Sequence, residues 1–145
     1  MKPNSLGEGK LERWIQRTFP DAGREPAGKR QQRLENQIRQ YFHGRRRVFD
    51  ISLDLRGRDF HKAVWEQVAR IPYGKTASYG EIAHLVGSPR ASRAVGAANG
   101  ANPVPIVVPC HRVIGANGSL TGYGGGLENK RWLLAHEGYV ACPTA

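Results

Sequence analysis

The feature of this sequence that most restricts its fold is a proline-rich segment that ends in a cysteine. Residues 102–110 read Asn-Pro-Val-Pro-Ile-Val-Val-Pro-Cys, with three prolines in this short stretch. Proline lacks a backbone N–H and fixes φ, which excludes an ordinary helix or a central strand here. We therefore expect a rigid, extended backbone that leads directly to Cys110.

Apolar residues spaced by three and four positions predict helices around this segment. The predicted helices cover about 31–42, 59–70, 79–86, 90–100 and 127–136, after a short amphipathic stretch at 11–19. Asp59 is the expected N-cap of the second helix. The turn Gly87-Ser88-Pro89 gives a helix-turn-helix pattern, which many two-helix corners share. The last helix is expected to pack through Leu127, Trp132, Leu134 and Ala135.

Extended structure is predicted at two places. Residues 48–55 alternate apolar and polar side chains, which predicts a half-buried strand whose partner is not visible in the sequence. Asn117-Gly118 predicts a hairpin turn between Val113-Ile114 and Leu120-Thr121. We therefore expect an α+β protein. A small N-terminal part with a reduced sheet (1–57) precedes a mainly helical domain (58–145) with a helix-turn-helix and a short hairpin next to Cys110.

The charge and the cysteines narrow the class of partner. The chain has 22 Lys and Arg against 12 Asp and Glu, a net charge of +10, which favours nucleic acid, with an acidic protein as the alternative. There is no apolar run of about 18 residues and no apolar signal core, so we expect no membrane contact and a cytoplasmic location (nuclear in a eukaryote). A basic chain that is not secreted is expected in a reducing compartment, so we expect Cys110 and Cys142 to be free thiols. They have no C-x-x-C spacing, so we expect no metal site.

The second helix of the helix-turn-helix pattern is built almost entirely from small residues, with Arg93 standing among them. Small side chains let a backbone approach either a neighbouring helix or a DNA groove closely. The small residues are Ala91, Ala94, Gly96, Ala97, Ala98 and Gly100.

Cys110, His111 and Arg112 supply a nucleophile, a base and a cation in sequence. A thiolate is the useful nucleophile, and an adjacent base or positive charge produces it. Glu137 is the candidate that orients the imidazole and stabilises its protonated form. The alternative is a buried, inert cysteine that lies beside a histidine by chance.

The segment Pro109-Cys110-His111-Arg112-Val113 resembles the active-site motif of the O6-alkylguanine-DNA alkyltransferases, also called methylated-DNA–protein-cysteine methyltransferases. Other segments are similar to the family in the same order, so the resemblance covers about residues 60–138. These segments are Ile71-Pro-x-Gly74-Lys-x-x-Ser78-Tyr79, Arg93-Ala-Val-Gly96, Asn102-Pro103, Gly122-Tyr-x-Gly-Gly126-Leu, Lys130, Leu133-Leu134 and Glu137-Gly138.

The resemblance implies a DNA repair function in which Cys110 irreversibly accepts the alkyl group of a flipped O6-alkylguanine, in a single turnover and without a cofactor. It implies that His111 acts on Cys110 through a water and that Glu137 supports His111. Asn102 would brace the turn before the active-site segment, and Tyr79 would donate a proton to the guanine.

The resemblance also implies how the substrate and the DNA are held. Backbone groups of Cys110 and Val113 would read the guanine edge, Pro105 and Tyr123 would surround the alkyl group, and the Gly124 N–H would contact O6. A monomer would bind double-stranded DNA through the minor groove, with Arg93 filling the base stack. The further DNA-binding candidates are Ser78, Arg90, Ser92 and Ala94.

This chain departs from the family pattern in three ways. Its N-terminal part offers one clear strand where a fuller domain is usual, and Gly124 stands where some members have serine. The zinc-ligand cysteines of some relatives have no counterpart.

Three rival functions remain open. An alkyltransferase-like protein binds lesions without transfer but replaces the nucleophile, whereas Cys110 is present here. A helix-turn-helix regulator would use Arg90 and Arg93 but leaves the Pro-Cys-His-Arg segment unexplained. A Cys–His–Glu hydrolase accounts for neither the charge nor the small-residue helix.

Overall fold

The computed structural model describes residues 29–53, 55–120 and 126–139, and the chain divides into two compact units, residues 1–54 and 55–145. The predicted amphipathic stretch at 11–19 lies outside the described residues, as do Thr121, Tyr123, Gly124 and Cys142. Among the described residues, no helix is long and apolar enough to cross a membrane.

The first unit contains helix α2 (Lys29–Phe42), which confirms the predicted helix. The helix ends where Gly44 adopts a φ of 75°, a left-handed conformation that glycine accepts without a steric penalty. The Gly44 N–H donates to the Tyr41 carbonyl, and the Arg45 N–H donates to the Gln40 carbonyl. These carbonyls of the last turn therefore keep hydrogen-bond donors. Ile38, Tyr41 and Phe42 are buried.

The strand predicted at 48–55 is wrong: none of its described residues belongs to a strand. The side chain of Gln37 on α2 replaces the partner strand, because its Oε1 accepts the Asp50 N–H at 2.9 Å and its Nε2 donates to the Asp50 carbonyl at 3.2 Å. The ring of Phe49 lies 5.9 Å from that of Tyr41. Arg33 also forms an ion pair with Asp50 at 2.7 Å. The alternation in the sequence therefore reflects alternating exposure of a segment that side chains bind, without a β-ladder among the described residues.

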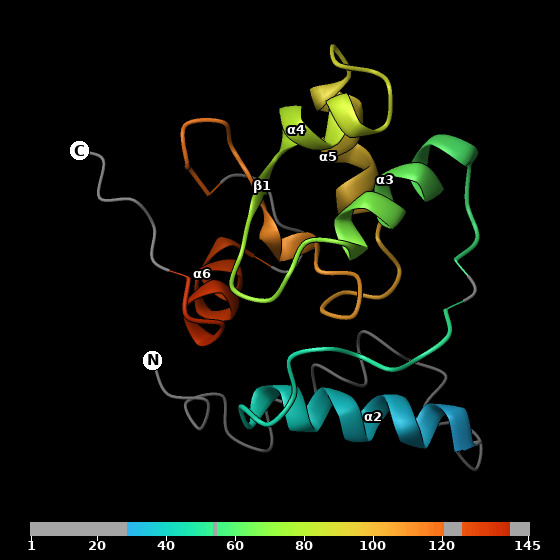
Figure 1. Cartoon of the computed structure of the whole chain (residues 1–145), viewed down its shortest axis with the longest axis vertical. Helices are drawn as coiled ribbons and strands as arrows, with labels where there is room; N and C mark the ends of the chain where they lie inside the picture. The colour runs from blue at the N-terminus through green and yellow to red at the C-terminus, as the bar shows by residue number, and fades with distance from the viewer. Residues whose placement is uncertain (1–28, 54, 121–125, 140–145) are drawn as a thin grey trace. The chain divides into compact units, whose positions relative to one another are not determined.

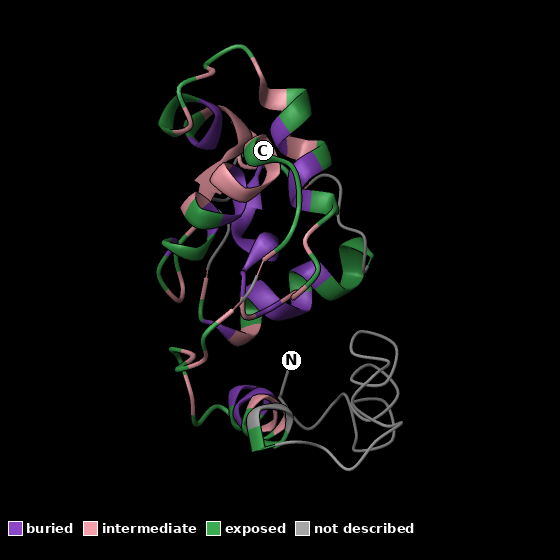
Figure 2. Ribbon diagram, turned by 90° about the vertical axis from the view of Figure 1, so that its right-hand side faces the viewer, coloured by how far each residue is buried: buried purple, intermediate pink, exposed green. Residues whose placement is uncertain are grey.

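The second unit is mainly helical. Helices α3 (Asp59–Ala69), α4 (Tyr79–Leu85) and α5 (Ser92–Gly100) pack on one another, and α6 (Leu127–His136) contacts the 3₁₀ helix η3 (Cys110–Arg112) (Figure 1). These bounds confirm the four predicted helices to within two residues at each end. Figure 2 shows buried residues along the inner faces of the helices. The buried residues of α3, α4 and α5 include Val64, Val68, Ile82, Val95 and Ala98.

Two details of the helix predictions are wrong. Asp59 is the first residue of α3 and not its N-cap, a place taken by Arg58, so Asp59 acts as an acidic residue in the first turn, where the helix dipole favours it. In α6, Leu127 and Ala135 are exposed, and the buried residues are Lys130, Trp132, Leu133 and Leu134.

The helix-turn-helix is formed by α4 and α5. Ser78 caps α4 in a reciprocal capping box: its hydroxyl accepts the Glu81 N–H at 3.0 Å, and the Glu81 carboxylate accepts the Ser78 N–H at 3.2 Å. Gly87 turns the chain after α4 with a φ of 79°. The indole N–H of Trp65 donates to the Ala98 carbonyl at 2.8 Å and ties α3 to α5.

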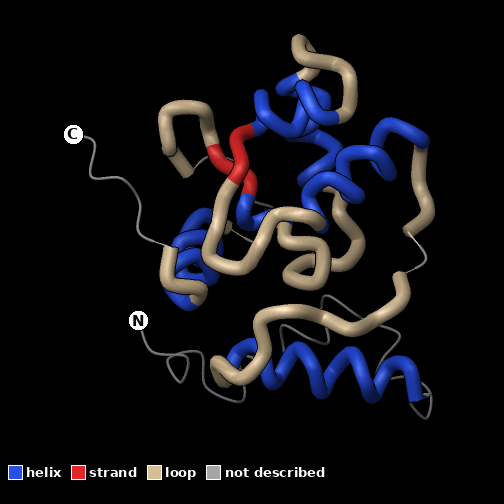
Figure 3. The backbone as a smooth tube through the Cα atoms, viewed as in Figure 1, coloured by secondary structure: helices blue, strands red, loops and turns tan. Residues whose placement is uncertain are grey.

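A two-stranded sheet joins the two halves of this unit. Strands β1 (Ala77–Ser78) and β2 (Val113–Ile114) are parallel, with Ala77 opposite Val113 and Ser78 opposite Ile114 (Figure 3). The predicted turn after Ile114 forms, because the Gly115 N–H donates to the Ser119 carbonyl at 2.9 Å. Its expected hairpin partner is wrong at Leu120, which is not in a strand; β2 pairs with β1 instead. The α+β class is confirmed.

The proline-rich segment is bent and not extended, which corrects that expectation. The Val108 N–H donates to the Val104 carbonyl at 3.0 Å, and Pro105 forms an isolated bridge with Val108. At the tip of this turn the buried Ile106 has a φ of 75°, which a β-branched residue rarely adopts. The prolines exclude regular structure, as predicted, and the chain uses them to build a tight turn before Cys110.

Burial on α4 predicts which of its two large aliphatic residues holds the fold. Ile82 is fully buried and Leu85 is 59% exposed, so we expect Ile82→Ala to lower the free energy of unfolding by about 3 kcal/mol and Leu85→Ala by under about 1 kcal/mol. Chemical denaturation of the full chain measures both. Equal losses from the two variants would contradict the packing described for α4.

Candidate active site

Cys110 lies at the start of η3, between the turn of the proline-rich segment and β2, and is buried. Its N–H donates to the Val108 carbonyl at 2.8 Å. Its carbonyl accepts two hydrogen bonds, one from the Val113 N–H and one from the Asn99 side-chain amide at 3.1 Å. The main chain of Cys110 is therefore held on both sides.

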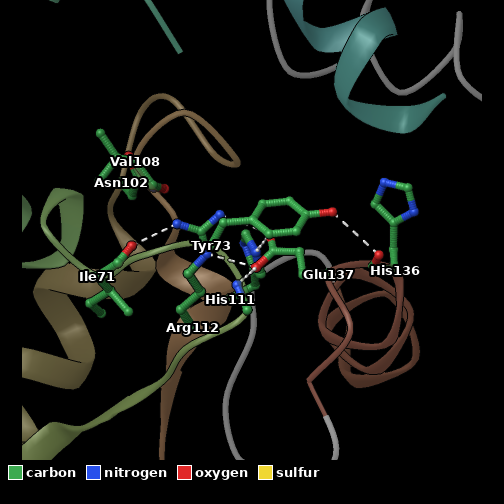
Figure 4. Close-up of polar contacts among 9 residues, drawn as sticks. Ile71, Tyr73, Asn102, Val108, His111, Arg112, His136 and Glu137 are labelled. Atoms are coloured by element: carbon green, nitrogen blue, oxygen red, sulfur yellow. Dashed lines mark hydrogen bonds and ion pairs between the residues drawn. The ribbon is translucent and has the colours of Figure 1, made fainter. Parts of the chain in front are cut away.

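The carboxylate of Glu137, directly after α6, collects four hydrogen bonds. It accepts from His111 Nε2 at 2.7 Å, from Arg112 Nε and Nη2 at 2.8 and 2.9 Å, and from the Gly74 N–H at 3.3 Å (Figure 4). The side chains of His111 and Glu137 are both fully buried. The structure thus brings the predicted His111 and Glu137 together, and adds Gly74, whose role the sequence did not indicate.

The bond to Glu137 assigns the tautomer of His111. Because the carboxylate is an acceptor, Nε2 carries the proton and Nδ1 presents a lone pair in the neutral ring. Nδ1 is buried and has no hydrogen-bond partner among the described residues. The imidazole is oriented on one side and keeps an acceptor on the other.

Burial and hydrogen bonding set the ionisation of this pair. Burial lowers the pKa of His111, and the hydrogen bond and charge of Glu137 only partly oppose it. Burial alone would raise the pKa of Glu137, but hydrogen bonds from His111 and Arg112, together with their charges, hold it well below its ordinary value. The ground state is therefore a neutral imidazole beside an ionised carboxylate whose charge is balanced by Arg112.

Arg112, the cation that follows Cys110 and His111 in sequence, is bound to Glu137. Besides its two bonds to Glu137, it donates through Nη1 to the Ile71 carbonyl at 2.7 Å. Its guanidinium carbon lies 5.7 Å from the ring centroid of Tyr73. A bidentate, buried arginine of this kind fixes the position of Glu137.

Lys130 on α6 is a buried residue to which the sequence assigned no role. Its Nζ donates to the Val113 carbonyl at 2.6 Å and lies 5.8 Å from the ring centroid of Tyr79. Burial lowers its pKa to about 8, and the charge of Cys110 partly opposes this shift. Lysines are almost never fully buried, so the sequence alone gave no signal for this placement.

Asn102 holds the turn of the proline-rich segment from both ends. Its Nδ2 donates to the Val108 carbonyl at 2.7 Å, and its Oδ1 accepts the Val104 N–H at 3.0 Å. Pro105 lies half-buried in the same turn. These contacts are those of a bracing residue.

The remaining predicted site residues fall into three groups, one of which lies outside the described residues. Val113 is buried in β2, and Tyr79 is half-buried at the start of α4. Both lie near Lys130, whose Nζ donates to the Val113 carbonyl and lies 5.8 Å from the Tyr79 ring centroid. The DNA-binding candidates lie on or next to α4 and α5: Arg90, Arg93 and Ala94 are exposed, whereas Ser78 and Ser92 are half-buried. Tyr123 and Gly124 lie outside the described residues. Val95, Ala98 and Asn99 form the buried side of α5, so its small residues serve internal packing as well as exposure.

A protein-family model described as 6-O-methylguanine DNA methyltransferase, DNA binding domain, matches residues 59–139. This match covers more than half of the chain, and the chain therefore belongs to this family, which confirms the resemblance seen in its motifs.

Curated relatives carry the corresponding name. A methylated-DNA–protein-cysteine methyltransferase of Mycolicibacterium paratuberculosis is 62% identical over 101 residues, covering 70% of this chain and 61% of that protein. A protein of the same name from Methanosarcina acetivorans is 56% identical over 102 residues, covering 70% of this chain and 65% of that protein. The chain thus spans under two thirds of the length of these relatives.

Solved structures show the same fold. Mycobacterium tuberculosis OGT in complex with DNA aligns with a TM-score of 0.72 at 57% identity, over 73% of this chain and 66% of that one. S. pombe Atl1, in complex with damaged DNA containing O6-carboxymethylguanine, aligns with a TM-score of 0.51 at 37% identity, over 58% of this chain and 80% of that one.

The buried His111 predicts a pH dependence of stability. Its folded pKa lies below the value of 6.5 expected when unfolded, so the unfolded chain binds the proton more readily, and stability falls as the pH drops below about 6.5. We expect His111→Gln to flatten the loss of unfolding free energy between about pH 7 and pH 5. The contribution of Glu137, whose pKa is also lowered, is lost only at more acidic pH.

Denaturation midpoints across this pH range measure the effect. His84→Gln, at an exposed histidine on α4, is the matched control for replacing a histidine by glutamine. If His111→Gln shows the same slope as the parent, the imidazole is not neutral in the folded state.

Proposed function

We propose that this chain repairs DNA by transferring the alkyl group of an O6-alkylguanine to Cys110. The observation that carries the proposal is the pairing of His111 with Glu137 directly next to a buried cysteine, in a chain that belongs to the alkyltransferase family. The names of the curated relatives support the same activity.

The thiol is activated by a proton relay. The neutral His111 accepts the Cys110 proton at Nδ1 through a bridging water, and the ionised Glu137 stabilises the imidazolium that forms. The positive charge of Lys130 favours the thiolate, since the two groups interact electrostatically. Asn102 keeps the turn before Cys110 in shape.

The transfer is a single displacement. The thiolate sulfur forms a bond to the alkyl carbon while the bond from that carbon to guanine O6 breaks, and its electron pair remains on the guanine. The guanine takes up a proton from the Tyr79 hydroxyl, which regains one from solvent or from His111. Cys110 ends as a thioether, so each molecule acts once and needs no cofactor.

Recognition requires the lesion to leave the base stack. We propose that a monomer places α5 in the minor groove of double-stranded DNA, where Ala94 and its small neighbours allow close approach and Arg90 and Ser92 assist. Arg93 fills the space that the flipped nucleotide leaves, which offsets the few kcal/mol that flipping costs. The net charge of +10 and the likeness to two proteins solved with DNA support this proposal.

The pocket around the guanine has three proposed parts. Backbone groups of Cys110 and Val113 read the guanine edge, Pro105 and Tyr123 surround the alkyl group, and the Gly124 N–H contacts O6.

A lesion-binding function without transfer is the second candidate, favoured by the likeness to Atl1.

Intact-protein mass spectrometry distinguishes the two candidates. After incubation with a duplex that carries one O6-methylguanine, we expect a gain of one methyl group per chain, located on Cys110 and absent in Cys110→Ala. Unchanged mass with tight lesion binding would support the recognition protein, and unchanged mass without lesion preference would refute both.

Arg93 tests the flipping step. We expect Arg93→Ala to slow methyl transfer from the duplex by about 5- to 30-fold, because a filling side chain worth about 1–2 kcal/mol is lost from the flipped state. Rapid-quench mass spectrometry measures the rate. Arg131→Ala, at an exposed arginine on α6, is the matched control. Equal rates in the two variants would exclude Arg93 from base flipping.

A further inference from the structure

Asn99 is a buried polar residue to which no step of the proposed reaction assigns a role. It lies on the buried side of α5 and is only 4% exposed. Its Nδ2 donates to the Cys110 carbonyl at 3.1 Å, whereas its Oδ1 is buried and has no hydrogen-bond partner among the described residues. Buried side-chain oxygens are nearly always paired, so this one calls for an explanation.

The neighbouring carbonyl fixes the orientation of the amide. Rotating the Asn99 amide by half a turn would place its oxygen against the Cys110 carbonyl oxygen, two acceptors with no proton between them. The NH₂ group must therefore face Cys110, and Oδ1 must point away from it.

Neither packing nor hydrogen-bond satisfaction explains why an amide is buried here. The Cys110 carbonyl already accepts the Val113 N–H, so it would keep one partner without Asn99. A leucine, which has the same number of heavy side-chain atoms, would leave no unpaired oxygen and would remove only one of the two hydrogen bonds to the Cys110 carbonyl. What leucine cannot supply is a link from α5 to the main chain of the cysteine.

Two asparagines near the end of α5 hold the active-site segment at alternate residues. Asn102 donates to the Val108 carbonyl and braces the turn, whereas Asn99 donates to Cys110 itself. Asn99 lies on the side of α5 away from the exposed Arg93 and Ala94. Asn99 thus provides a direct hydrogen bond between the helix proposed to contact DNA and the residue proposed to attack the lesion.

We propose that Asn99 is a positioning residue for alkyl transfer, which holds the Cys110 main chain at a fixed place relative to α5. The inference rests on the proposed function, because it concerns the alignment of the sulfur with the alkyl carbon of a nucleotide flipped out of DNA. Misplacement of a reacting group by about 1 Å slows a reaction by about 100-fold.

Asn99→Leu tests this role in the full chain. With a duplex carrying one O6-methylguanine, we expect the limiting single-turnover rate to fall by about 10- to 100-fold. Affinity for the same duplex, measured in a Cys110→Ala background, should change by less than about twofold, since the exposed face of α5 is unaltered. Thermal stability is measured in parallel, and we expect the fall in rate to exceed what any loss of stability explains, because the Cys110 carbonyl keeps the Val113 N–H.

Asn99→Asp separates position from charge. A buried carboxyl can still donate to the Cys110 carbonyl while it is protonated, but once ionised it loses the donor and disfavours the thiolate, so the pH profile of the rate should shift relative to that of the parent. Asn99→Leu should lower the plateau without such a shift. Asn36→Leu and Asn36→Asp, at an exposed residue of α2, are the matched controls.

The outcomes separate this inference from the proposed function. An unmethylated parent chain refutes the proposed function, and the role of Asn99 falls with it. A methylated parent with an unchanged rate in Asn99→Leu overturns the inference alone. A rate that falls only in step with thermal stability or DNA affinity also overturns it, since that would show a merely structural residue.

Discussion

The second unit depends on one buried carboxylate. Glu137, which directly follows α6, accepts hydrogen bonds from Gly74 in the loop before β1 and from His111 and Arg112 in η3. Removing a charge of this kind would leave the Arg112 guanidinium buried and unpaired, which typically costs several kcal/mol. The same group that joins three segments of the chain also orients the imidazole beside Cys110, so stability and chemistry share one interaction.

The helices could be predicted because each carries an apolar face at helical spacing, as in Val64 and Val68 of α3. The strand at 48–55 is wrong, because the same alternation also arises when side chains such as Gln37 and Arg46 bind the backbone in place of a neighbouring strand. The pairing of His111 with Glu137 could be predicted from the residue types present and from their order in the chain. Lys130 and Asn99 could not, since burial of a lysine or of a half-paired amide depends on long-range contacts that local sequence does not encode.

The proposed nucleophile is therefore supported by main-chain contacts as much as by acid–base groups. Asn99 and Asn102 hold carbonyls two residues apart, and Lys130 holds the carbonyl of Val113 further along. All three donors come from, or directly follow, the helices on either side of the segment. Rigid support of this kind lowers the entropic cost of aligning the sulfur with a reacting carbon, because the main chain of Cys110 is held in place before a substrate binds.

The sheet of two residues per strand has a consequence out of proportion to its size. β1 runs directly into Tyr79, and β2 follows η3, which begins with Cys110. The register that sets Ser78 opposite Ile114 therefore fixes the position of the proposed proton donor, Tyr79, relative to the proposed nucleophile, Cys110. A slip of one residue would move one against the other by about 3.3 Å and reverse the direction of the side chains. An insertion in a loop elsewhere in this unit would leave this register unchanged, whereas an insertion between a strand and the proposed reactive residue beside it would alter their separation.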